Sequence, residues 1–354
     1  MRIKQTSKSR IHEVDFNQLK FGEQFTDHMM ICHFRDGNWE EPQIVPYGPL
    51  TIDPSMSVLH YGQAVFEGMK AFKDDQGGIW LFRPEENFNR INKSAKRLCI
   101  PEFPEDYFFK GLEALLNLDQ DWIKPGMGNS LYIRPFCYAS QAGVQASAAN
   151  AYTFIIICAP VGSYYNGEVN VLIAEQYSRA ASGGVGFAKA AGNYAAQFYP
   201  TALALEKGYQ QIIWTDANTH EYLEEAGTMN IFFRINDTLV TAPTSDRILD
   251  GITRKSVIAL AKSLNIAIEE RPFKVAELLS AYEDGSLKEI FGSGTAVVVR
   301  PIKGFGYQEK HYQLAEIENP VADLLKEKIT SIQYNLGEDP FGWRRAVPMT
   351  VFSK

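Results

Sequence analysis

The segment "GGVGFAKAAGNY", residues 183–194, carries one charged side chain, Lys189, among glycine, alanine and apolar residues. From residue 180 to residue 205 no other side chain is charged. Neighbours of this kind give an ammonium group no polar shell, and desolvation favours the neutral amine. Because only a neutral amine attacks a carbonyl, the segment indicates a lysine that forms a Schiff base.

Two other interpretations of this segment are weighed against that one. Most lysines lie on solvated surfaces, so a glycine-rich loop with its lysine in water is the ordinary alternative. A phosphate-binding loop does not fit, because the GxxxxGK[ST] spacing is missing and Lys189 stands where the last glycine of GxGxxG belongs. The glycines also permit a flat ligand to approach the backbone closely.

The composition is typical of a globular protein with two domains. The chain has 354 residues, 45% of them hydrophobic, and a net charge of −7, which argues against nucleic-acid or anionic-membrane partners. No apolar run is long enough to span a bilayer, and the first residues lack the apolar core of a secretory signal, so we expect a cytoplasmic protein. The cysteines have no metal-ligand spacing and predict reduced, mostly buried thiols and no metal site: Cys32, Cys99, Cys137 and Cys158.

Hydrophobic patterns predict two mixed α/β (α+β) halves, a first domain at residues 1–160 and a second at 169–354, joined by a linker at 161–168. In the first half we expect a hairpin at 28–40, strands at 79–84, 130–140 and 151–160, and helices at 84–100 and 105–118. In the second half we expect strands at 169–175, 210–216, 228–237 and 238–243, a helix from Asn193 to Gly208 interrupted at Pro200, and a helix at 253–265 capped by Thr253.

Five further motifs accompany the lysine segment in a consistent order: "HYGQAVFEGMKAF" (60–72), "RLCIP" (97–101), "LEEAGTMNIFF" (223–233), "LDGITR" (249–254) and "EIFGSGTA" (289–296). Together they resemble the branched-chain-amino-acid aminotransferases, pyridoxal 5′-phosphate (PLP) enzymes of fold type IV. The resemblance runs from about Phe21 to about Tyr334. It implies a D-amino-acid-aminotransferase-like fold, with a smaller N-terminal domain, a larger C-terminal domain and the PLP site between the two.

The resemblance assigns cofactor roles to residues of these motifs. Lys189 holds PLP as a Schiff base and carries the proton of the substrate Cα, which needs a group that acts first as nucleophile and then as acid and base. Glu225 faces the pyridine nitrogen, because the electron sink requires a protonated ring. Adjacent Glu224 is expected to face the opposite way if the segment is extended. Tyr194 donates a hydrogen bond to the phenolic oxygen of PLP, and Arg179 belongs to the same cofactor pocket.

The phosphate of PLP is assigned to an arginine and to a helix start. Arg90 is the implied arginine, although the residues alone do not distinguish it from Arg83 and Arg97 on the same helix face. Backbone N–H groups of Ile252 and Thr253 bind the anion at the positive end of the helix dipole, with Gly251 allowing the turn. Thr295 completes this binding site.

The implied substrate pocket must accept both an apolar side chain and the second carboxylate of glutamate. Its aromatic wall is Phe21, Tyr61, Phe66 and Tyr132, and Arg134 binds the second carboxylate. The α-carboxylate is assigned to Thr228, Thr295 and Ala296. Val144 matches a loop position that the partner subunit contributes, which implies a homodimer.

The implied reaction is transamination of L-leucine, L-isoleucine and L-valine with 2-oxoglutarate. The alternatives are a D-amino-acid transaminase or an aminodeoxychorismate lyase of the same fold group, and a protein without enzymatic activity that carries PLP or binds phosphate. Some animal members follow "GTA" with a CxxC thiol switch. Val297 and Arg300 occupy those positions here, so thiol regulation of that kind is not expected.

Overall fold

The computed structural model of the protein describes residues 1–162 and 167–350, which form two compact units. Unit 1 comprises Met1–Tyr164, Ala188–Gly192 and Ser331–Lys354, and unit 2 comprises Tyr165–Phe187 and Asn193–Thr330. The C-terminal residues join unit 1 because β21 (Arg344–Ala346) pairs with β7 (Ile79–Phe82) of that unit, whereas the sequence pattern grouped them with the second domain. Part of the predicted linker, residues 163–166, lies outside the described residues.

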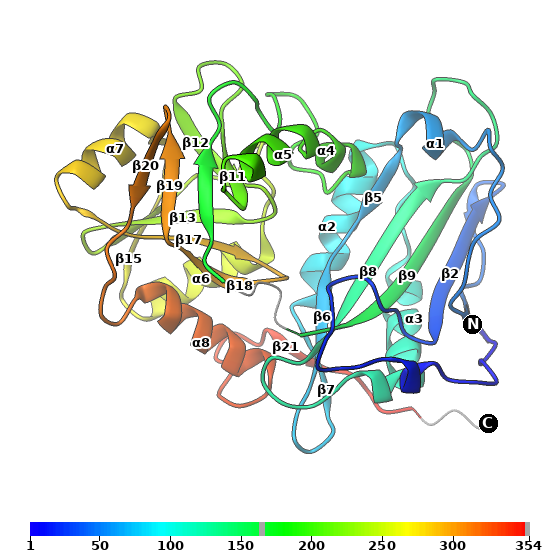
Figure 1. The fold of residues 1–354 in the computed structure, drawn as a ribbon. Coiled ribbons are helices and arrows are strands. Elements are labelled where there is room, and N and C mark those ends of the chain that lie inside the picture. The colour runs from blue at the N-terminus through cyan, green and yellow to red at the C-terminus, as the bar shows by residue number, and fades with distance from the viewer. Residues whose placement is uncertain (163–166, 351–354) are drawn as a thin grey trace. The chain divides into compact units, whose positions relative to one another are not determined.

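Unit 1 is built on one ten-stranded sheet in the order β1-β4-β2-β9-β8-β6-β7-β21, with β3 added to β2 and β5 added to β8 (Figure 1). Its pairings are antiparallel apart from the parallel pair of β1 and β4. The remaining strands are β1 (Arg2–Ile3), β2 (His28–Arg35), β3 (Asn38–Trp39), β4 (Gln43–Pro46), β5 (Ala64–Phe66), β6 (Met69–Lys73), β8 (Ser130–Ala139) and β9 (Tyr152–Val161).

Helices α2 (Pro84–Arg97) and α3 (Glu105–Leu118) pack against this sheet and close the main core of unit 1 (Figure 1). α2 begins with Pro84, has two glutamates in its first turn, and buries Phe88, Ile91 and Ala95 at helical spacing. Both helices agree with the sequence prediction. A short helix α1 (Ser57–Tyr61) and two 3₁₀ turns, η1 (Ile11–Glu13) and η2 (Gln120–Trp122), complete the unit.

Unit 2 contains a six-stranded sheet, β16-β12-β11-β10-β19-β20, and a five-stranded sheet, β15-β14-β13-β17-β18. Apolar side chains of both sheets form one core. The strands of the first sheet are β10 (Asn170–Ile173), β11 (Gln211–Thr215), β12 (Tyr222–Ala226), β16 (Phe273–Lys274), β19 (Gly304–Tyr307) and β20 (Lys310–Gln313). Those of the second are β13 (Asn230–Ile235), β14 (Thr238–Thr241), β15 (Ala267–Glu270), β17 (Leu287–Gly294) and β18 (Val298–Ile302).

The helices of the second half depart from the sequence prediction at their starts. The helix expected after Asn193 is two helices, α4 (Ala191–Ala195) and α5 (Phe198–Glu206), and the break precedes Pro200 because a proline is tolerated in the first turn of a helix. Helix α6 (Ile252–Ser263) begins one residue before Thr253, so the prediction that Thr253 caps it was wrong. The others are α7 (Val275–Glu283) and α8 (Val321–Gln333).

Candidate active site

Lys189 lies in the short segment Ala188–Gly192, which the fold attaches to unit 1. Val65 of β5 and Ala190 form an antiparallel bridge, and the backbone N–H of Phe66 donates to the carbonyl oxygen of Lys189 at 3.0 Å. The N–H of Lys189 donates to Oγ of Ser94 on α2 at 2.9 Å. The backbone around the lysine is therefore held on one side by a strand and on the other by a helix.

Glu67, which follows β5, brings a carboxylate to this lysine, and sequence reasoning did not find it. Its side chain is fully buried and accepts from Nε and Nη2 of Arg90 at 2.6 and 2.9 Å, and from Nδ2 of Asn87 at 2.7 Å. Burial alone would raise the pKa of Glu67, but the Arg90 guanidinium, the charge of Lys189 and the Asn87 bond outweigh it and hold the pKa below its ordinary value. Arg90 and Lys189 thus share one buried counter-ion.

An aromatic wall extends from Lys189 across the sheet of unit 1. Nζ of Lys189 lies 4.8 Å from the centroid of the Phe66 ring, and the guanidinium carbon of Arg134 lies 4.6 Å from the same centroid. Nη2 of Arg134 donates to the hydroxyl of Tyr132 at 3.0 Å, and Phe21 meets the Tyr132 ring edge-on at 4.8 Å. Four of the predicted pocket residues are therefore connected to Lys189 through contacts within one unit.

Tyr61 and Val144 form a separate pair. The Tyr61 hydroxyl donates to the carbonyl oxygen of Val144, and both side chains are exposed in the single chain, Val144 at 60%. They lie on α1 and on the loop after β8. The structure joins these two predicted residues to each other.

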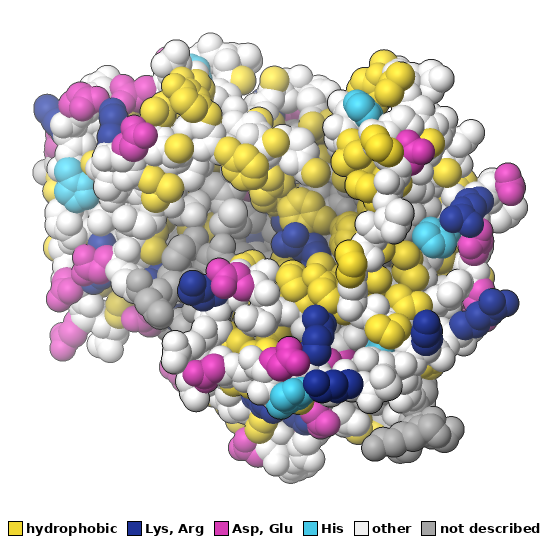
Figure 2. Space-filling view, turned by 45° about the vertical axis from the view of Figure 1, so that its right-hand side comes forward, with side chains coloured by type: hydrophobic (Ala, Val, Ile, Leu, Met, Phe, Trp, Pro, Cys, Tyr) yellow, Lys and Arg dark blue, Asp and Glu magenta, His cyan; other side chains and the backbone are white. Residues whose placement is uncertain are grey.

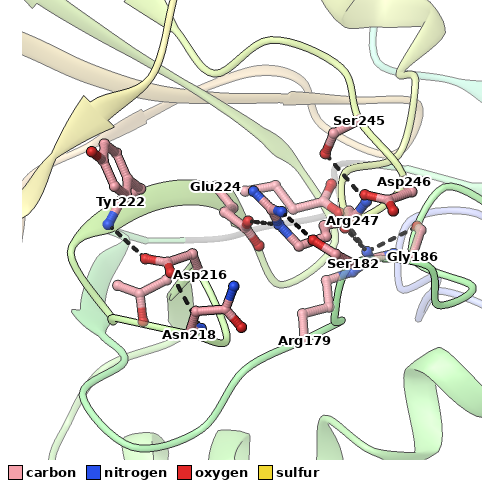
Figure 3. A network of polar contacts seen from close by, with 12 residues as sticks. Arg179, Ser182, Gly186, Asp216, Asn218, Tyr222, Glu224, Ser245, Asp246 and Arg247 are labelled. Atoms are coloured by element: carbon pink, nitrogen blue, oxygen red, sulfur yellow. Dashed lines mark hydrogen bonds and ion pairs between the residues drawn. The ribbon is translucent and has the colours of Figure 1, made fainter.

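Unit 2 carries two adjacent glutamates on β12, and each pairs with a different arginine, the pair of Glu224 and Arg247 being drawn in Figure 3. Oε1 of Glu225 lies 2.8 Å from Nη1 of Arg179 and accepts from the N–H of Leu249 at 3.2 Å. Glu224 pairs with Nε of Arg247. Both residues are only 4% exposed. Neither is therefore a solvated surface glutamate, which is the usual state of this residue type.

The glycine-rich segment passes close to Arg247, and this explains one of its glycines. Nη1 of Arg179 donates to the carbonyl oxygens of Gly186 and Arg247 at 3.0 and 2.8 Å. A Cβ on Gly186 would lie 2.6 Å from Cα and from the carbonyl oxygen of Arg247, closer than real contacts allow. Gly186 therefore permits two backbones to converge on Arg179.

The start of α6 offers backbone donors. Gly251 is the N-cap and has no side chain with which to cap the first turn, so the amides of Ile252 and Thr253 at this helix start are candidate donors for an anion. The φ of Gly251 is −68°, so the turn itself does not require glycine. The requirement is spatial, because a Cβ there would lie 1.9 Å from Oδ1 of Asn230.

The residues assigned to the α-carboxylate lie in neighbouring turns of unit 2. Thr228 occupies the turn between β12 and β13, and Thr295 and Ala296 occupy the turn between β17 and β18. The two turns lie close together, because a Cβ added to Gly294 at the end of β17 would lie only 3.3 Å from the Thr228 carbonyl oxygen. Tyr194 lies half-buried in α4.

Each unit contains groups that suit PLP chemically. Unit 1 has the Lys189 amine for an aldehyde and the Arg90 guanidinium for a phosphate. Unit 2 has a buried carboxylate, Glu225, for a pyridine nitrogen and the helix start of α6 for an anion. Across residues 1–162 and 167–350 no three His, Cys, Asp or Glu side chains are grouped so as to hold a metal ion. In the same ranges, no helix has the length and apolar character needed to cross a bilayer.

Comparison with known proteins identifies the family. The Amino-transferase class IV family model matches residues 64–305. Branched-chain-amino-acid aminotransferase 2 of Bacillus subtilis is 42% identical, covering 100% of this chain and 99% of its own. The probable branched-chain-amino-acid aminotransferase of Staphylococcus aureus strain N315 is 44% identical over 94% of each chain.

Solved structures agree on the fold. The branched-chain aminotransferase of Thermoproteus uzoniensis, solved with norvaline, has a TM-score of 0.76 at 25% identity and covers 91% of this chain and 100% of its own. The Escherichia coli branched-chain amino acid aminotransferase has a TM-score of 0.75 at 26% identity over 91% and 99%. The prediction of a fold type IV enzyme is confirmed. The chain therefore belongs to the class IV aminotransferases, and among them to the branched-chain-amino-acid aminotransferases.

Proposed function

We propose that this enzyme uses PLP to transfer the amino group between L-leucine, L-isoleucine or L-valine and 2-oxoglutarate. The observation that carries the proposal is the Phe66 ring, which lies close to both the Lys189 amine and the Arg134 guanidinium. An apolar wall with one cation suits a branched side chain in one half-reaction and a second carboxylate in the other. The two relatives compared above, which match 94–100% of this chain, are named as a branched-chain-amino-acid aminotransferase and a probable one.

In this proposal each assigned residue has its own role toward PLP. When bound, PLP supplies an aldehyde that bonds an amine and a protonated ring that accepts the electron pair of the substrate Cα. Lys189 would provide the amine at Nζ, and the same atom would later remove the proton from Cα. Glu225, paired with Arg179, would hold the proton on the pyridine nitrogen. Tyr194 would donate a hydrogen bond to the phenolic oxygen of PLP.

The remaining assigned residues bind and orient. Arg90, the amides of Ile252 and Thr253, and Thr295 would hold the phosphate, with Glu67 setting the direction of the Arg90 guanidinium. Thr228, Thr295 and Ala296 would hold the α-carboxylate. The aromatic wall of Phe21, Phe66 and Tyr132 excludes water from the side-chain position, and Arg134 pairs with the second carboxylate of glutamate.

We further propose a cytoplasmic homodimer in which Tyr61 and Val144 of each chain lie at the subunit interface. Unit 1 exposes large apolar side chains just before and within α1 in the chain, and hydrophobic side chains gather at the upper right of the space-filling view (Figure 2). The exposed residues are Leu50, Ile52 and Leu59. Exposed apolar patches are typical of association surfaces.

A substrate panel followed by absorbance tests the proposed function. Adding L-leucine to the purified, PLP-loaded enzyme should shift its visible absorbance, and 2-oxoglutarate should restore it. D-alanine and the aminodeoxychorismate substrate should cause no turnover. Turnover with either of these and none with L-leucine would reassign the chain to another activity of the fold group, and a spectrum indifferent to every amino acid would indicate a PLP carrier.

A further inference from the structure

Arg247 connects three segments of unit 2 that carry assigned cofactor residues (Figure 3). Its side chain binds Glu224 on β12, next to Glu225. Its Nη1 donates to Oγ of Ser182, the residue just before the glycine-rich segment, at 2.7 Å. Its own carbonyl oxygen accepts from Arg179. Neither Arg247 nor Glu224 has a role in the reaction proposed above.

Glu224 is a buried charge that depends on this arginine. Its side chain is 3% exposed, and within the described residues its Oε2 is buried without a hydrogen-bond partner. Burial raises the pKa of Glu224, and the charge of Asp216 adds to this, while Arg247 and, more weakly, Arg179 oppose it. A buried carboxylate without a cation is strongly destabilised. If Arg247 is removed, Arg179 is the other arginine that acts on the charge of Glu224.

That other arginine is the partner of Glu225. We infer that Arg247 is a positioning residue, which neutralises Glu224 so that Arg179 remains paired with Glu225. Without Arg247, Glu224 and Glu225 compete for Arg179, and Glu225 loses the ion pair that fixes its carboxylate at 2.8 Å from Nη1. The inference rests on the proposed function, since Glu225 is the assigned partner of the pyridine nitrogen.

A pair of variants separates this role from a purely structural one. Arg247→Leu should weaken the binding of PLP to the stripped enzyme by about tenfold or more, the size of coupling expected for residues in one ion-pair network. Arg247→Leu combined with Glu224→Gln should bind PLP within about threefold of the wild-type constant, because removing both members of a buried pair is nearly neutral. The pH dependence of the bound absorbance should change in the single variant and return in the double variant.

Arg234→Leu is the matched control, since Arg234 also pairs with a buried glutamate of unit 2, Glu289, at 2.8 Å. It should lower the stability of the stripped protein without changing PLP affinity. A double variant as weak as Arg247→Leu, or an Arg247→Leu variant no weaker than the control, would overturn the inference. Failure of the wild-type enzyme to bind PLP or to transaminate would instead overturn the proposed function.

Discussion

Glu67 is the residue on which the Lys189 site depends most. It is fully buried and compensates two cations, Arg90 through two hydrogen bonds and Lys189 through its charge. A charge at this depth is tolerated only because it is paired and hydrogen-bonded. The neutrality of the chain around Lys189 therefore describes its sequence neighbours and does not describe its spatial ones.

Glu67→Gln should reduce the free energy of unfolding by about 3 kcal/mol, because the variant leaves the Arg90 guanidinium buried without an anion. Glu86→Gln is the control, since Glu86 in the first turn of α2 pairs with Arg83, the residue before that helix, at 3.3 Å but is 35% exposed. It should change stability by less than about 0.5 kcal/mol. Urea unfolding at neutral pH measures both. Equal losses in the two variants would contradict the account of Glu67.

The same pair predicts a pH dependence. The pKa of Glu67 is lowered by folding, so its contribution to stability is full well above the ordinary value of 4.5 and is lost as the pH falls through the folded pKa. The stability difference between wild type and Glu67→Gln should therefore shrink as the pH is lowered from about 6 to below 4. A difference that stays constant over this range would show that Glu67 is not ionised in the folded protein.

Arg134→Leu should separate the two halves of the reaction. Losing the guanidinium removes a charge-assisted bond to the second carboxylate, so kcat/KM for glutamate should fall about 10- to 100-fold. The value for leucine should change by less than about fivefold, because leucine has no group for Arg134 to bind. Steady-state kinetics with both amino donors measure the ratio, and parallel losses would remove Arg134 from substrate recognition.

At the scale of elements, the sequence predicted the start of α6 closely but did not predict which residue caps it. The segment "TRKSVIALAKSLN" predicted a helix start at residue 253, one residue after the observed start at Ile252, because apolar residues at helical spacing are a local signal. It misassigned the cap, since the demand on Gly251 comes from Asn230, 21 positions earlier in the chain. The partnership of Glu67 with Lys189 was hidden for the same reason, because a bridge between β5 and residue 190 creates it.

Gly251→Ala should test whether α6 presents its amides to an anion. The new Cβ would lie 1.9 Å from Oδ1 of Asn230, and relieving that overlap should cost about 1–3 kcal/mol and displace the helix start. PLP affinity should fall accordingly. Gly48→Ala is the control, because nothing lies within 4 Å of its Cβ position and its φ is ordinary. Unchanged PLP affinity in Gly251→Ala would argue against phosphate binding at this helix.

At the scale of the whole molecule, the residues assigned from the sequence fall in both units. Unit 1 contains Lys189, Arg90 and the aromatic wall, and unit 2 contains Glu225, the start of α6 and the turns with Thr228 and Thr295. Five residues, Ala188–Gly192, interrupt unit 2 in the chain and belong to unit 1. Hydrophobic patterns predicted the mixed α/β class, and the motifs predicted the family. The assignment of residues 188–192 and of the C-terminal residues to unit 1 depends on long-range strand pairing, which no local pattern records.

The proposed homodimer gives a test at this scale. Leu59→Asp places a charge on a side chain that is 55% exposed, within the apolar surface of unit 1 near Tyr61, and should convert dimers into monomers. Met127→Asp, at a residue 67% exposed elsewhere on unit 1, should leave the dimer intact. Light scattering across a dilution series distinguishes the two, and a monomeric wild-type protein would contradict the proposal.

The central claim is that the amine of Lys189 is the group that bonds PLP. Reducing the PLP-loaded enzyme with borohydride, digesting it and mapping the labelled peptide tests this claim most directly. The account predicts one pyridoxyl group, on Lys189, in the peptide that contains "GGVGFAKAAGNY". A label on Lys70, Lys255 or any other lysine would contradict it.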